Sequence, residues 1–214
     1  MDEELIIIDN STKVEKIKNF FVHNKKNFII FILIILFLLI GYFSFDEIKK
    51  RNQIKIANQF NTVVLGYEIG EKKKIKNILE NIINEKDTSY SPLALYFLID
   101  NKIIDDRNRI NEFFDVIIND IKLDEEIKNL IIYKKALYNS DFINENELIQ
   151  ILNPVINSES LWKSHGLYLI AEYFYSKREN EKAKEFFKQI INLKNANNDI
   201  KTEAQKRLNR DLSE

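Results

Sequence analysis

An uncharged apolar run from Phe28 to Phe45 constrains this chain more than any other feature. Fifteen of its 18 residues are Phe, Ile or Leu, and lysines flank it on both sides. As an α-helix the run is roughly 27 Å long at about 1.5 Å per residue, close to the bilayer's hydrocarbon thickness of about 30 Å. At about −0.4 kcal/mol per large apolar residue, membrane insertion is favourable by about −6 kcal/mol. The run therefore predicts a transmembrane helix over residues 28–45.

Two other interpretations of the run fit less well. A fully buried core helix of this length would need a larger protein around it. A cleaved signal peptide usually has an apolar region of only about 7–15 residues and a small-x-small cleavage site, and the following "GYFSFDEIKK" offers no such site. We expect an uncleaved anchor that contacts the lipid bilayer.

The charges that flank the run do not fix its orientation. Cytoplasmic flanks usually carry the excess of Lys and Arg. Here the two flanks carry five and four basic residues, namely Lys13, Lys16, Lys18, Lys25 and Lys26 before the run and Lys49, Lys50, Arg51 and Lys55 after it. Charge alone leaves the topology open.

The segment 1–27 contains a pattern typical of a short basic amphipathic helix. Thr12 and Glu15 have capping-box spacing. Apolar residues then recur at helical spacing at Val14, Ile17, Phe20 and Phe21. Such a helix lies in the headgroup region; the alternative is a plain extension of the anchor helix.

The region 46–214 reads as successive helices with a hydrophobic period near 3.6 residues, so the fold class is all-α. The expected helices cover residues 46–67, 71–85, 91–102, 107–121, 124–140, 144–157, 160–177, 180–193 and 198–212. The first of them can continue the membrane span, because no Gly or Pro separates Phe45 from Val64.

Three local signals support these helix boundaries. Ser91 precedes a proline and is expected to cap its helix. The acidic residues at 124–126 suit the positive end of a helix dipole. Pro154 is expected to kink or end its helix.

A helical repeat is visible at the C-terminal end. Apolar or small residues in "HGLYLIAEYFYSKRENEKAKEFFKQII" have the spacing of one tetratricopeptide unit, and they are Leu167, Ile170, Ala171, Phe174, Ala183, Phe187 and Ile190. Positions equivalent to Phe187 are Leu79, Phe114 and Leu152, at intervals of 35, 38 and 35 residues. About four hairpins are predicted, stacked as a short α-solenoid with a concave surface.

The sequence carries few signals of catalysis. P-loop, dinucleotide-binding, metalloprotease and nucleophile-elbow motifs are absent, and there is no cysteine. Residues 46–214 contain 27 basic and 28 acidic residues, whereas a nucleic-acid surface is clearly basic. We expect no enzyme activity, no cofactor, no metal site and no nucleic-acid partner.

Tyrosines on the first helix of each hairpin are candidates for protein binding. A tyrosine buries a large ring and keeps a polar tip, which suits an extended polypeptide ligand. The candidate residues are Tyr96, Tyr133, His165, Tyr168, Glu172 and Tyr175. The alternative is that these rings fill the core between repeats, as we expect for Trp162.

The layout resembles the YfgM-like family of ancillary SecYEG translocon subunits. The resemblance rests on the acidic start "DEEL", on Phe20, Phe21 and Asn24 before the span, on Gly41-Tyr42 near its outer end, and on the last repeat. It covers most of the chain in architecture.

This resemblance implies a function that the residues alone do not supply. It implies an inner-membrane protein with a cytoplasmic N-terminus and a periplasmic repeat domain. Its implied partners are the SecYEG translocon, a membrane-anchored periplasmic chaperone of the prolyl-isomerase type and exported client proteins. The residue-level observations fit equally well a membrane-tethered scaffold or regulator of another envelope complex.

Overall fold

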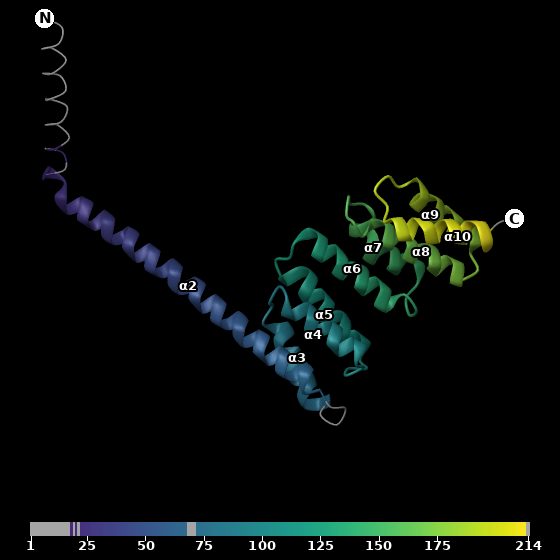
Figure 1. The fold of residues 1–214 in the computed structure, drawn as a ribbon, viewed down its shortest axis with the longest axis horizontal. Helices are drawn as coiled ribbons and strands as arrows, with labels where there is room; N and C mark the ends of the chain where they lie inside the picture. Colours follow the sequence, from purple (N-terminus) through teal and green to yellow (C-terminus); the bar gives the residue numbers. More distant parts are fainter. Residues whose placement is uncertain (1–17, 19, 21, 68–71, 213–214) are drawn as a thin grey trace, which may run out of the picture. The chain divides into compact units, whose positions relative to one another are not determined.

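The structure is a computed structural model that describes residues 18, 20, 22–67 and 72–212 (Figure 1). All regular structure in these residues is helical, which confirms the all-α prediction. The chain divides into two compact units, Met1–Lys55 and Ile56–Glu214. The expected capping box at Thr12 and Glu15 lies outside the described residues.

Helix α2 (Lys25–Leu65) contains the apolar run. Large apolar side chains described between residues 29 and 45 have exposed fractions from 42% at Ile35 to 79% at Phe37. Among the described residues, α2 is the one helix long and apolar enough to cross a membrane. Its polar part continues the apolar part as expected, because the backbone stays helical without interruption to Leu65, two residues before the expected end at 67.

In the described part of the second unit, the end of α2 is followed by eight further helices (Figure 1). They are α3 (Lys72–Asn84), α4 (Tyr90–Asp100), α5 (Arg107–Asp120), α6 (Glu125–Asn139), α7 (Glu145–Ile156), α8 (Lys163–Ser176), α9 (Asn180–Asn192) and α10 (Asn198–Arg210). From α3 onward each helix packs against the next, and α3 also contacts α5, α6 contacts α8, and α8 contacts α10.

Side-chain caps explain where several of these helices begin. The Asp124 carboxylate accepts a hydrogen bond from the Glu126 amide at 3.0 Å at the start of α6. Asn144 and Glu147 form a complete capping box at the start of α7. Each cap satisfies backbone amides that have no partner within the helix. At the other end of α7, the helix stops two residues after Pro154.

The prediction that Ser91 caps its own helix is wrong. Helix α4 already begins at Tyr90, and the Asp87 carboxylate accepts from the amides of Ser89 and Tyr90 at 2.9 and 2.8 Å. Ser91 is fully buried, and its hydroxyl donates to the Ile82 carbonyl near the end of α3 at 3.0 Å. Carbonyls at a helix end lack partners within the helix. Ser91 therefore supplies a hydrogen-bond donor to the end of α3 and not a cap to the start of α4.

The described residues of the second unit form two hydrophobic clusters, and both include residues of α6. The first cluster contains Ile56 and Val63 of α2, buried residues of α3, α4 and α5, and Ile131 of α6. The second contains Ala136 of α6 and buried residues of α7 to α10. The helix α6 therefore links the two halves of this unit.

Candidate functional site

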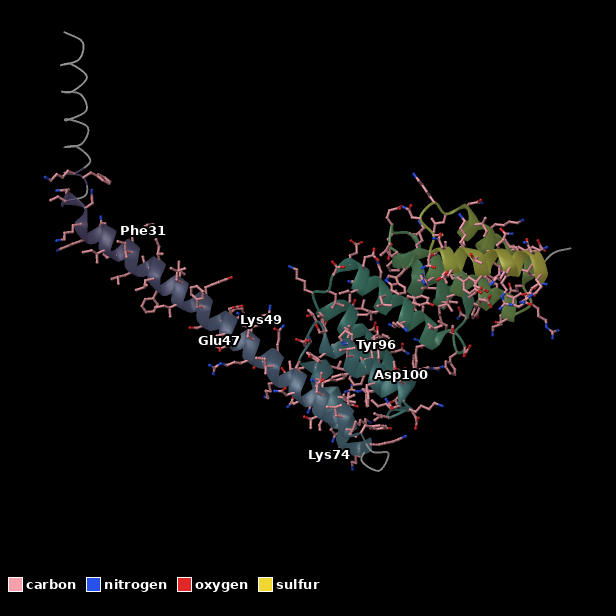
Figure 2. All side chains as sticks on the ribbon, in the orientation of Figure 1. Phe31, Glu47, Lys49, Lys74, Tyr96 and Asp100 are labelled. Carbon is pink, nitrogen blue, oxygen red and sulfur yellow. The ribbon has the colours of Figure 1, made fainter. Side chains whose placement is uncertain are left out.

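A half-open cavity of about 240 Å³ lies between α4, α5 and α6. Its lining residues are Tyr96, Ile99, Asp100, Phe114, Lys134, Leu137 and Tyr138. Tyr96 and Asp100 lie one turn apart on α4 (Figure 2). Phe114 is 1% exposed and its ring centroid lies 6.0 Å from that of Tyr138, so the base of the cavity is apolar.

The polar groups of this cavity have unusual surroundings. The Tyr96 hydroxyl is buried and has no hydrogen-bond partner among the described residues. Burial raises the pKa of Tyr96 to about 12, because the phenolate is poorly solvated there. The Lys134 ammonium nitrogen lies 5.9 Å from the Tyr96 ring centroid, within cation–π distance. Tyr96 is thus a neutral donor beside a cation.

A second group of candidates forms an aromatic cluster between α6 and the start of α8. Tyr133 stacks on Trp162 with ring centroids 5.8 Å apart, and His165 lies 4.9 Å from Trp162. The His165 Nδ1 atom is buried and has no hydrogen-bond partner among the described residues, and burial lowers the pKa of His165. This cluster therefore places Tyr133 and His165 together, both beside Trp162.

The remaining three candidates, Tyr168, Glu172 and Tyr175, converge on Arg207 of α10. Arg207 donates two hydrogen bonds to the Glu172 carboxylate, at 2.7 and 2.8 Å. Its guanidinium lies 4.9 Å from the Tyr175 ring centroid. Asp211 accepts a third hydrogen bond from Arg207 at 2.9 Å and, together with Glu172, raises the pKa of the guanidinium. Glu172 and Tyr175 are therefore occupied by contacts within the chain.

The six predicted residues thus lie in three places along the helices of the second unit. The sequence did not predict two residues that contact these candidates, Lys134 beside Tyr96 and Arg207 beside Glu172. A signal for Arg207 did exist, because it follows Glu172 by 35 residues, the interval of the repeat. The same signal exists for Lys134, which follows Tyr96 by 38 residues, the interval between the second and third helix pairs.

Among the described residues, no three His, Asp or Glu side chains are grouped so that they could hold a metal ion. Comparison with protein-family models, with curated proteins and with solved structures finds no match for this chain.

Proposed function

We propose that this chain is a membrane-anchored, tetratricopeptide-like protein that binds other proteins through its second unit. The proposal gives α2 the role of a single-pass anchor. It gives the helices after α2 a binding role and no catalytic one.

The observation that carries the proposal is the recurrence of buried residues at the repeat interval. Four helix pairs follow one another along the chain, and each contributes one buried position from its first helix and three from its second helix. The equivalent positions of consecutive pairs are 35, 38 and 35 residues apart, against about 34 for an ideal repeat. Each of these side chains is at most 6% exposed; the four sets are Val63, Ile75, Leu79 and Ile82; Leu98, Ile110, Phe114 and Ile117; Ala136, Leu148, Leu152 and Val155; and Ala171, Ala183, Phe187 and Ile190.

The contacts between helices also support a repeat. The helix α8 packs on α6 and on α10, and α7 and α9 each pack on the helices before and after them. In a helical solenoid each hairpin buries its apolar side against its neighbours in this way. Stacked hairpins leave one row of first helices for ligands, and α4, α6 and α8 belong to that row.

The anchor role is supported by the exposure of the apolar part of α2. No protein element covers these side chains within the described residues, including Phe31 (Figure 2), which is 60% exposed. An apolar helix of this size that lacks a protein partner is stabilised by lipid.

The resemblance to YfgM-like subunits suggests the partners and the orientation. On this proposal the chain lies in a bacterial inner membrane with its N-terminus in the cytoplasm and its second unit in the periplasm. There it associates with the SecYEG translocon, with a membrane-anchored chaperone and with exported proteins. The alternative is a scaffold or regulator of another envelope complex.

Orientation is measured first, and the cysteine-free sequence makes this direct. Single substitutions Lys18→Cys and Lys188→Cys place one thiol on each side of the span. A membrane-impermeant maleimide applied to intact spheroplasts should label Lys188→Cys at once and Lys18→Cys only after permeabilisation. The opposite pattern would overturn the periplasmic assignment.

Partners are then captured by photo-crosslinking in native membranes. Probes belong at Leu137 and Leu161, which are 43% and 71% exposed, and not at Tyr175, which packs against Arg207. Lys18 serves as the control position on the other side of the span. Translocon subunits or periplasmic chaperones at Leu137 and Leu161 support the export role. Reproducible capture of a different envelope complex there would favour the scaffold alternative.

A further inference from the structure

The cavity between α4, α5 and α6 has the features of an anchor pocket for a partner polypeptide. We propose that it takes one large apolar side chain of an extended segment, with an acidic residue of that segment facing Lys134 and a basic one facing Asp100. This inference rests on the proposed protein-binding function and makes it specific.

The size and lining of the cavity indicate a single side chain. Its volume of about 240 Å³ is below the range of about 300–1,000 Å³ that is usual for small-molecule sites. The apolar groups of Ile99, Phe114 and Leu137 line it. Leu137, one of these lining residues, is 43% exposed, so its apolar surface is available to a partner. Burial of one anchoring side chain in such a pocket commonly dominates the affinity of a protein interface.

The charges at the cavity indicate what flanks the anchor. Lys134 and Asp100 are both exposed, and neither forms an ion pair with another described residue. By contrast, the neighbouring Lys135 of α6 pairs with Asp115 of α5 at 2.6 Å. Two unpaired charges of opposite sign beside one apolar cavity are complementary to a segment that carries both signs. Such rim charges contribute mainly to orientation and specificity.

The test uses the full chain in lipid nanodiscs and short synthetic peptides with a fluorescent label. The reference peptide has a central Phe flanked by Glu on one side and Lys on the other. Variants replace Phe with Ala, or both charges with Gln. Fluorescence anisotropy gives the affinity. Because burying a large apolar side chain contributes about 1.5–3 kcal/mol, the Ala peptide should bind roughly tenfold to hundredfold more weakly.

The pocket is assigned with a charge-reversal variant and a matched control. Lys134→Glu should weaken the reference peptide about threefold, as expected for a rim ion pair, and a peptide with Lys in place of Glu should recover that loss. Lys188→Glu makes the same charge change on α9, outside the cavity, and should leave the affinity unchanged. Thermal melting checks that both variants fold.

Three results would overturn the inference. One is equal binding of the Phe and Ala peptides, and another is an equal effect of Lys134→Glu and Lys188→Glu. In the second case peptide binding itself persists, so the proposed function stands while the pocket assignment fails. The third is binding of none of the peptides. If crosslinking at Leu137 and Leu161 also captures no protein, the proposed function fails as well.

Discussion

The ion pair between Glu172 and Arg207 joins α10 to α8. Each side chain is 27% exposed, and two hydrogen bonds of 2.7 and 2.8 Å join them. Exposed ion pairs contribute about 0.2–1 kcal/mol, whereas breaking a buried pair costs about 3–5 kcal/mol. Bidentate geometry at intermediate burial gives an expected coupling free energy of about 1.5 kcal/mol.

A double-mutant cycle measures this coupling. The variants are Glu172→Gln, Arg207→Gln and the double substitution, and urea unfolding of the full chain in detergent is followed by circular dichroism. The control is the cycle for Lys182 and Glu145, which join α9 to α7 at 2.8 Å but are 48% and 37% exposed; its coupling should stay below about 0.5 kcal/mol. Equal coupling in the two cycles would refute the view that the pair holds α10 in place.

Two further predictions concern the second unit. Burial lowers the pKa of His165 below its ordinary value of about 6.5, so the unfolded state binds a proton more readily and stability should fall as the pH drops from about 7.5 to about 5.5. His165→Asn should reduce this dependence in urea midpoints; an unchanged slope would contradict it. Lys102 has a φ of 48°, a left-handed conformation that favours glycine, so Lys102→Gly should raise the free energy of unfolding by about 0.5–1 kcal/mol. Lys177→Gly, at a φ of −85°, should lower it; a gain in both variants would show that the backbone conformation is not the cause.

Most helix boundaries were predictable because they depend on local interactions. Capping side chains such as Asp124 act within one turn of the helix they start. The prediction at Ser91 failed because its hydroxyl had two acceptable uses. The local use is to cap the start of α4. In the structure the hydroxyl instead donates to the Ile82 carbonyl of α3, nine residues earlier in the chain. Only the packing of α3 on α4 distinguishes them.

The candidate site was predictable only in part. Tyr133 and Tyr168 are one repeat interval of 35 residues apart, yet the structure gives the candidate tyrosines different surroundings. Tyr96 lines a cavity, Tyr133 stacks on Trp162, and Tyr175 packs against Arg207. These differences arise from side chains about 30 residues apart in the sequence, whose contacts depend on how each pair of helices crosses.

The sequence by itself determined the helical content, the apolar span and the interval of the buried positions. Helical hydrogen bonds join residues four apart, and the transfer of an apolar run into lipid depends on its composition, so both can be read locally. The tertiary structure alone decided which charges are paired between helices. Glu172 is neutralised by Arg207 from α10, whereas Lys134 and Asp100 are left beside a cavity. Those outcomes depend on the distance and angle between packed helices, which no local pattern of residues specifies.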